Sequence, residues 1–457
     1  MNKRFEKLTD NCEDYSSASR ASLVDFLTQS SSDSDAGDIT DPIIRNVDSS
    51  APRIINVSPN FEVEYEEGVV FDTIKPVLIT GKAGSGKSFV IHSVVDYCMK
   101  NDLSILFSCP TAYQARSFLN SFDDTCTIHA DTIHSLFKIP IDSTENMSIN
   151  WSLIRYDIVI IDEVGMVSNN NITHIFKTLK VLPVSPLLIM AGDNKQQKPL
   201  CTTSSGTGEA KSIFLLPYIL SQCDKFKLYK EIRCDCTILN DILNEIRDSF
   251  PSTKTLSHLN NMRCCNKGDV SSEIVIKAFQ DNPHTTFLTI TRKAASFINN
   301  CIIHYLFHEQ CPLAENIKIS NGEEINLYQG MQIMITKNIC KTLGIVNGEC
   351  AVINDFKKEN ILVSLHNGKH VFLHLTLDED HHDDYYPLIP NYALTIFKSQ
   401  GKTIDHVTVW LDNDVVSPGA GYVAFSRARC HKSIKLLEEV QSRQVCPITN
   451  IQDEIQI

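Results

Sequence analysis

From about Pro76, the spacing of apolar residues is first that of a strand and then that of a helix. The run Val77–Thr80 is short, apolar and β-branched, which is typical of a buried strand. After a cluster of glycines, the segment 88–100 places apolar residues at helical spacing. This order predicts a strand, a glycine-rich loop and a helix. Two later apolar runs, at 156–161 and 186–191, predict further strands.

A different pattern occupies residues 328–375. Short apolar runs alternate there with polar turns, two of which contain Asn-Gly, a common hairpin sequence. This pattern predicts a small insert that resembles a β-barrel. Its expected strands are 331–335, 351–353, 361–365 and 371–375.

The N-terminal segment shows neither the apolar pattern of a strand nor that of a helix. Residues 28–38 form a polar, acidic run, which predicts disorder. Its serines lie beside aspartates, so the run is either a plain solvated tail or a phosphorylated one. Residues 1–72 carry 15 acidic and 6 basic side chains, and the whole chain has a net charge of −13. The rest of the chain is therefore close to neutral, and net charge does not exclude a nucleic-acid partner.

Length and composition narrow the class of protein. A chain of 457 residues is long enough for about two to four structural units. It has no apolar run near the length of a membrane span and no signal-peptide core, which argues against a secreted or integral membrane protein. The 16 cysteines are expected to be reduced intracellular thiols. Neither Cys234–Cys236 nor Cys264–Cys265 has a common zinc spacing, and 380–384 is expected to be an acidic loop.

The glycine-rich loop after the first predicted strand matches G-x-x-x-x-G-K-[ST] in full. Glycines let backbone amides close around phosphates, and the start of the following helix adds a partial positive charge. Lys87 is expected to reach the β- and γ-phosphates of ATP, and the Ser88 hydroxyl is expected to bind Mg²⁺. The residues assigned to nucleotide binding are Gly81, Ala83, Gly84, Ser85, Gly86, Lys87 and Ser88.

Two acids end the second predicted strand. Asp162 and Glu163 follow an apolar run, about 75 positions after the phosphate-loop lysine. An isolated Asp-Glu pair is usually surface charge. At the end of a buried strand in a phosphate-loop protein, the Asp is placed to hold Mg²⁺ and the Glu to polarise the attacking water. The catalytic interpretation is therefore favoured.

Three further residues are candidates for contacting the γ-phosphate. Gln196 follows the third predicted strand, and Arg233 and Arg427 lie further along the chain. An arginine delivered from a second domain stabilises charge in the transition state and couples domain closure to the nucleotide. Taken singly, the glutamine is equally well a loop residue, and a surface ion pair is the favoured interpretation of each arginine.

Eight short motifs in a fixed order together resemble superfamily 1B DNA helicases, with the PIF-like family as the closest group and RecD as a more distant relative. The resemblance covers residues from about 76 to about 438. The compact size and acidic leader are also similar to the PIF-like helicases of large insect DNA viruses. The motifs are 81–88, 109–112, 131–135, 161–166, 192–196, 232–233, 398–401 and 422–427.

The resemblance implies an α/β protein with two RecA-like domains, each a parallel sheet flanked by helices, with ATP between them. A short pin that splits the duplex is expected near 140–152. The implied division is an acidic, disordered segment at 1–60, a first RecA-like domain at 61–222, a second at 223–330 and 376–440, an SH3-like β insert at 331–375, and a C-terminal tail at 441–457.

The resemblance also assigns roles to side chains. Asp162 and Ser88 would hold Mg²⁺, Glu163 would act on water, Gln196 would sense the γ-phosphate, and both arginines would act across the cleft. His134 is either a packed or surface residue or, as the family motif implies, a contact to a DNA phosphate or base. The residues expected at the DNA are Pro110, Thr111, Thr132, His134, Asn347, Lys398 and Ser399.

The function implied by the resemblance is an ATP- and Mg²⁺-dependent DNA helicase that moves 5′ to 3′. Its expected partners are single-stranded DNA, forked duplex DNA and replication proteins, with no membrane contact and a monomeric state. Replication, recombination or repair inside the cell, in the nucleus (the host nucleus for a viral protein), is the expected setting. The alternatives are a translocase or RNA helicase on the same scaffold, and a nucleic-acid-binding protein without ATPase activity.

Overall fold

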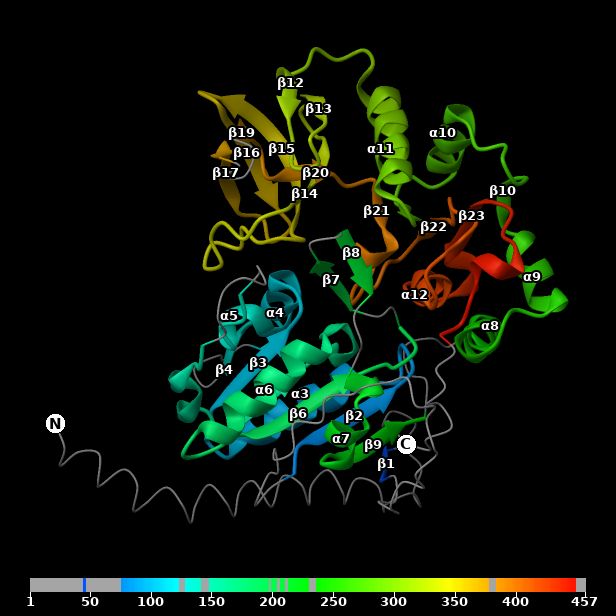
Figure 1. Cartoon of the computed structure of the whole chain (residues 1–457). Helices are drawn as coiled ribbons and strands as arrows, with labels where there is room; N and C mark the ends of the chain where they lie inside the picture. Colours follow the sequence, from blue (N-terminus) through cyan, green and yellow to red (C-terminus); the bar gives the residue numbers. More distant parts are fainter. Residues whose placement is uncertain are drawn as a thin grey trace.

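The computed structural model describes residues 44–46, 75–122, 128–140, 148–196, 199–203, 206–209, 213–229, 236–377 and 384–448. Figure 1 shows one α/β body at the bottom of the view, a second at the right and a β-rich insert at the upper left. No helix in these ranges is both long enough and apolar enough to cross a membrane. The cysteines within them form no disulfide.

The first body is built on a seven-stranded sheet in which all neighbours are parallel except the edge strand β1. In spatial order its strands are β1 (Ile44–Asn46), β9 (Asp224–Leu228), β2 (Val77–Gly81), β6 (Leu187–Gly192), β5 (Ile158–Ile161), β3 (Ile105–Cys109) and β4 (Ile128–Thr132). Its helices and turns are α3 (Lys87–Lys100), α4 (Ala112–Leu119), α5 (Ile133–Leu136), η2 (Trp151–Arg155), η3 (Val164–Met166), α6 (Asn169–Val181), η4 (Ile213–Leu215) and α7 (Pro217–Ser221). A hairpin, β7 (Leu200–Thr203) and β8 (Gly206–Glu209), is separate from the sheet.

Successive side chains of the central strands point to opposite faces of this sheet, and both faces are covered by helices. Ile158 and Ile160 pack in one apolar cluster with α3 and α4, whereas Val159 and Ile161 pack in another with α5, α6 and α7. Successive side chains of a strand point to opposite faces, so an unbroken apolar run suits a strand buried on both sides.

The second body has a five-stranded sheet that is parallel throughout. The predicted α/β fold with two parallel-sheet domains is therefore confirmed. The strands in spatial order are β10 (Arg263–Cys265), β23 (Ile434–Glu438), β22 (Val407–Trp410), β11 (Thr286–Thr289) and β21 (Ala393–Thr395). The helices and turns are α8 (Thr237–Asp248), α9 (Thr253–Asn260), α10 (Ser272–Asp281), α11 (Arg292–Phe307), η5 (Ile396–Ser399), α12 (Ala420–Phe425), η6 (His431–Ser433) and η7 (Ser442–Gln444).

The insert is larger than the expected 331–375. Its five-stranded antiparallel sheet ends with a strand at 388–390, which pairs with the one at 332–335, and its core includes Phe307 and Leu327. The boundary is corrected because these apolar side chains share one core. Resemblance to an SH3-like barrel stays a prediction. The strands are β12 (Ala314–Lys318), β13 (Glu324–Leu327), β14 (Gln332–Ile335), β15 (Cys350–Lys357), β16 (Asn360–Leu365), β17 (His370–His374), β18 (Thr376–Leu377), β19 (Asp384–Tyr385) and β20 (Leu388–Pro390).

Three other expected boundaries also change. The first domain extends past residue 222, because β9 pairs in parallel with β2 and completes its sheet. Within the expected disordered segment 1–60, β1 pairs antiparallel with β9, and the rest of that segment lies outside the described residues. The expected C-terminal tail begins as a packed segment, in which Val445 and Ile448 are buried.

Candidate nucleotide and nucleic-acid site

A cavity of about 430 Å³ lies where the two α/β bodies meet. The first body contributes most of its lining, including the phosphate loop, Asp162, Glu163 and Gln196. The second body contributes Gly401 and Arg427. Residues far apart in the sequence therefore line one cavity, and of the predicted γ-phosphate contacts it includes Gln196 and Arg427. Arg233 lies outside the described residues.

The phosphate loop connects β2 to α3 and has the backbone that its glycines permit. Gly84 and Gly86 have φ of +80° and +91°, a region that other residues rarely adopt. Lys87 begins the 14-residue helix α3, and its Nζ atom donates to the carbonyl oxygens of Gly81 and Lys82, both at 2.8 Å. The loop thus presents an ammonium group and a helix N-terminus at one place, an arrangement suited to phosphate.

The two acids lie directly after β5. Glu163 has a φ of +51°, which for a residue with a side chain stores strain of a kind that clusters at functional sites. Its backbone N–H donates to Asp162 Oδ1 at 2.8 Å. Burial and the neighbouring Glu163 charge raise the pKa of Asp162 to about 7. Because the Glu163 charge disfavours ionisation of Asp162, a divalent cation bound here would stabilise both carboxylates.

Gln196 lines the cavity from the loop that follows β6. Its side chain is 7% exposed, and its Oε1 atom has no hydrogen-bond partner among the described residues. A buried amide oxygen without a partner is costly, so such an atom in a cavity usually serves a ligand. Glycines in the phosphate loop and this unsatisfied amide both fit a bound nucleotide.

Arg427 is buried at 2% exposure, and its guanidinium is engaged within its own domain. Nε donates to the Val423 carbonyl at 2.9 Å, and Nη1 donates to the Ser399 and Lys402 carbonyls at 3.4 and 3.2 Å. Nη2 donates to Ser426 Oγ at 2.9 Å. Arg427 therefore joins the nucleotide cavity to the 398–401 motif.

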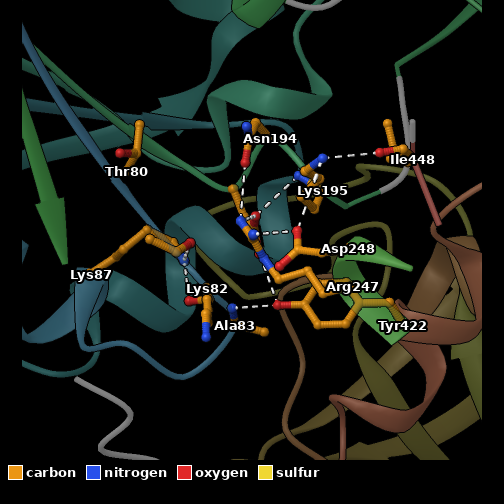
Figure 2. Close-up of polar contacts among 12 residues, drawn as sticks. Thr80, Lys82, Ala83, Lys87, Asn194, Lys195, Arg247, Asp248, Tyr422 and Ile448 are labelled. Carbon is orange, nitrogen blue, oxygen red and sulfur yellow. Dashed lines mark hydrogen bonds and ion pairs between the residues drawn. The ribbon is translucent and has the colours of Figure 1, made fainter. Parts of the chain in front are cut away.

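Contacts between the two α/β bodies involve Arg247, Asp193 and Tyr422, to which the sequence assigned no individual role. Arg247 on α8 donates from Nη2 to Asp193 Oδ1 at 2.9 Å and to Asn194 Oδ1 at 3.0 Å (Figure 2). The Tyr422 hydroxyl donates to Asp193 Oδ2 at 3.1 Å and accepts from the Ala83 N–H at 2.8 Å. Two side chains of the second domain are thereby bonded to the phosphate loop and the 192–196 motif of the first.

Asp193 remains charged at the centre of this network. Burial alone would raise its pKa, but the positive charges of Arg247 and Lys87, with two hydrogen bonds, hold it below the usual carboxyl value. Asp193 and Tyr422 lie inside sequence motifs, so their participation had a signal. Arg247 had none, since a charged residue on an amphipathic helix usually faces solvent.

The residues expected at the DNA lie on adjacent ends of the first sheet and on the facing parts of the second domain and insert. Thr111 and Thr132 cap α4 and α5, which follow the paired strands β3 and β4. Pro110 precedes Thr111 and is partly exposed, while His134, Asn347 and Lys398 are exposed. Across this region, the insert residue Lys341 forms an ion pair with Asp131 at 2.6 Å.

The prediction for Ser399 is not supported. Its side chain is fully buried, and its hydroxyl donates to the Ile396 carbonyl at 2.7 Å within η5. Ser399 therefore shapes this turn, and its own carbonyl accepts from Arg427. The expected pin near 140–152 is described only in part, because 141–147 lie outside the described residues. The described part leads into the 3₁₀ turn η2, which begins at the half-exposed Trp151.

Comparison with known proteins gives a consistent assignment. Residues 69–202 match the family model described as AAA domain. The chain is 22% identical to the ATP-dependent DNA helicase PIF1 of Xenopus laevis, over 87% of this chain and 64% of that protein. It is 24% identical to the ATP-dependent DNA helicase Pif1 of Bdellovibrio bacteriovorus, over 84% of this chain and 90% of that protein. The chain thus spans about two thirds of the frog protein and most of the bacterial one.

A solved structure extends the likeness to the fold. Bacteroides Pif1 helicase in complex with ADP-AlF3 and single-stranded DNA superposes with a TM-score of 0.61, at 21% identity, over 83% of this chain and 92% of that one. Two parallel sheets around a phosphate-loop cavity thus give this chain the fold of that Pif1 helicase structure. In sequence, the chain is similar, at 22–24% identity, to proteins named ATP-dependent DNA helicase PIF1 or Pif1.

Proposed function

We propose that this protein is an ATP-dependent DNA helicase that moves 5′ to 3′ along single-stranded DNA. The observation that carries the proposal is the position of Arg427, which lines the nucleotide cavity and bonds the backbone of the motif expected at the DNA. A change at either site would reach the other through this one side chain. The curated relatives are named ATP-dependent DNA helicases, which supports the same activity here.

Most of the residues that would hold the nucleotide line the cavity; of those assigned to this role, Gly81 and Ser85 do not. Backbone amides of the phosphate loop and Lys87 would bind the phosphates, while Ser88 and Asp162 would hold Mg²⁺. Bound Mg²⁺ would neutralise charge on the phosphates. Glu163 would accept a proton from the attacking water, and Gln196 would offer its unsatisfied amide to the γ-phosphate or to that water.

Arg427 would complete the site by a short movement. Its guanidinium now makes four hydrogen bonds to neighbours in the second domain. Turning toward the γ-phosphate would release the carbonyls of Ser399 and Lys402 and loosen the 398–401 segment. Hydrolysis would restore those bonds, so the grip on DNA would alternate with the state of the nucleotide.

A translocase with weak unwinding is the second candidate. The described part of the expected pin includes only one short 3₁₀ turn, with Trp151 at 55% exposure. An aromatic residue of this kind can stack on a base but offers little surface to wedge a duplex. The roles in replication, recombination or repair, the nuclear setting, the replication partners and the monomeric state are part of this proposal.

Strand displacement on tailed duplexes tests the activity and its direction. With Mg²⁺ and ATP, the wild type should release the labelled strand from a duplex with a 5′ tail and leave a 3′-tailed duplex intact. Lys87→Ala should bind DNA but displace nothing. Displacement from the 3′ tail would contradict the polarity. ATP-driven removal of streptavidin from biotinylated single strands, without duplex separation, would favour the translocase.

A further inference from the structure

Two cysteines and one histidine converge in the second domain, outside the nucleotide cavity. Cys236 immediately precedes α8, while Cys430 and His431 lie in the turn that leads to β23. The Sγ atom of Cys236 is 2.9 Å from His431 Nδ1, and that of Cys430 is 3.9 Å from the same nitrogen. All three atoms lie within 4.8 Å of one another, and all three side chains are half-buried.

These separations fit one tetrahedral ion. Zn–S bonds of about 2.3 Å and Zn–N bonds of about 2.0–2.1 Å place sulfur and nitrogen ligands about 3.5 Å apart. The two observed S···N distances lie on either side of that value, so small side-chain rotations would equalise them. Within the described ranges, no other trio of cysteine, histidine or acidic side chains meets at such short distances.

We propose that Cys236, Cys430 and His431 bind a structural Zn²⁺ ion. Thiolate and imidazole ligands together select zinc over the hard Mg²⁺ of the nucleotide site. The sequence predicted no metal here, because neither local cysteine pair has a common zinc spacing. Cys236 and His431 are 195 positions apart, so only the folded chain brings the ligands together.

A fourth ligand and a path for the ion are both at hand. The His258 ring on α9 lies with its centroid 5.9 Å from that of His431, close enough to complete the site after a rotation, or to leave the position to water. His431 also lines a cavity of about 600 Å³, through which an ion would reach this ligand. The three ligands and the distances between them thus meet the requirements of a metal site. His258 is the candidate for the fourth ligand, and the cavity beside His431 is the candidate entry path.

The ion would tie together the two segments that act across the cleft. Cys236 lies at the start of α8, whose last turn carries Arg247, and Cys430 follows Arg427 by three residues. Closing so long a loop restricts the unfolded chain, so metal binding would appear as folding stability. The ion would also hold the first residues of α8 in place, because Cys236 immediately precedes this helix.

Metal content of the intact, tag-free protein is the primary test. Purification in zinc-supplemented, chelator-free buffer should leave about one Zn²⁺ per chain by mass spectrometry, the stoichiometry of a single structural site. Replacement by Co²⁺ should give the thiolate-to-cobalt charge-transfer band and the strong visible bands of tetrahedral coordination. Both readouts use the wild type, so they remain decisive even if a variant fails to fold.

Variants then assign the ion to these residues. Cys236→Ser/Cys430→Ser and His431→Asn should lose the metal and the cobalt spectrum, whereas Cys311→Ser, at an exposed cysteine outside the cluster, should keep both. Chelation should lower the melting temperature of the wild type but leave that of the double variant unchanged. A wild type without zinc, a Cys236–Cys430 disulfide in its place, or zinc retained by the double variant would each overturn the proposal.

Discussion

The Arg247 guanidinium of the second domain lies 2.9 Å from the Asp193 carboxylate of the first, and neither side chain has appreciable access to solvent. Ion pairs on protein surfaces contribute little, but a buried pair leaves a costly unpaired charge when one partner is removed. Asp193 belongs to the loop that carries Gln196, and Arg247 lies in the last turn of α8. The pair therefore links the orientation of the second domain to the loop beside the γ-phosphate.

Arg247→Met should destabilise the folded protein by about 3–5 kcal/mol, because Asp193 would remain buried without its main partner. Urea denaturation followed by fluorescence measures the change. Arg443→Met is the matched control, since Arg443 pairs with Asp414 at an exposed site, and it should cost about 0–1 kcal/mol. Equal effects of the two variants would refute a special role for the buried pair.

Tyr422→Phe should weaken ATP binding as well as stability. The hydroxyl is the hydrogen-bond acceptor for the Ala83 N–H of the phosphate loop, and an unsatisfied buried donor costs about 1–3 kcal/mol. The control is Tyr392→Phe, another buried tyrosine, whose hydroxyl accepts from the Gln332 N–H in a different place. That variant should lose stability but bind ATP normally. Calorimetric titration with ATP separates the two outcomes.

Binding of Mg·ATP should depend on pH through Asp162, the expected ligand of the ion. Burial and the Glu163 charge raise its pKa to about 7, so the carboxyl is largely protonated in mildly acidic solution. An ion that requires the carboxylate must then displace a proton. Affinity should fall about tenfold per pH unit below 7 and level off above it.

Calorimetry in two buffers of different ionisation enthalpy would detect the proton release at pH 6. ATP with EDTA should show no such release, and neither should Mg·ATP binding to Asp162→Asn. A pH-independent affinity for Mg·ATP would show that Asp162 is not the group that titrates.

Substitution of Lys341 and substitution of Asp131, which form an ion pair, should change the affinity for single-stranded DNA in opposite directions. Asp131→Asn frees the lysine and removes a negative charge beside Thr132, so affinity for single-stranded DNA should rise at low salt. Lys341→Met removes a cation from the same place and should lower the affinity. Fluorescence anisotropy against salt concentration measures both. If both variants changed the affinity in the same direction, the DNA would not bind beside this ion pair.

The sequence could predict those site residues that lie close along the chain to the strand that positions them. The phosphate loop, the two acids and Gln196 are each adjacent to their strands, and strand ends of a parallel sheet meet at one edge, so sequence patterns located one side of the cavity. Arg247 and the Cys236–Cys430–His431 cluster depend on contacts between distant segments. Ser399 was misassigned because a motif specifies a residue type but not whether its hydroxyl faces solvent or a backbone carbonyl.

Boundaries were misplaced for a related reason. β9 and β20 are short, and each belongs to its sheet only through pairing with a distant strand. Hydrophobic periodicity predicts that a strand exists but not which sheet it joins. The first domain and the insert were therefore both drawn too small.

ATP hydrolysis with and without single-stranded DNA, in the wild type and in Arg427→Lys, tests the coupling of the two sites most directly. The wild type should hydrolyse ATP faster when DNA is present. Arg427→Lys should bind ATP but lose the stimulation, because an ammonium group cannot reproduce the planar set of bonds to Ser399, Lys402 and Val423. Wild-type hydrolysis that is indifferent to DNA would contradict the account.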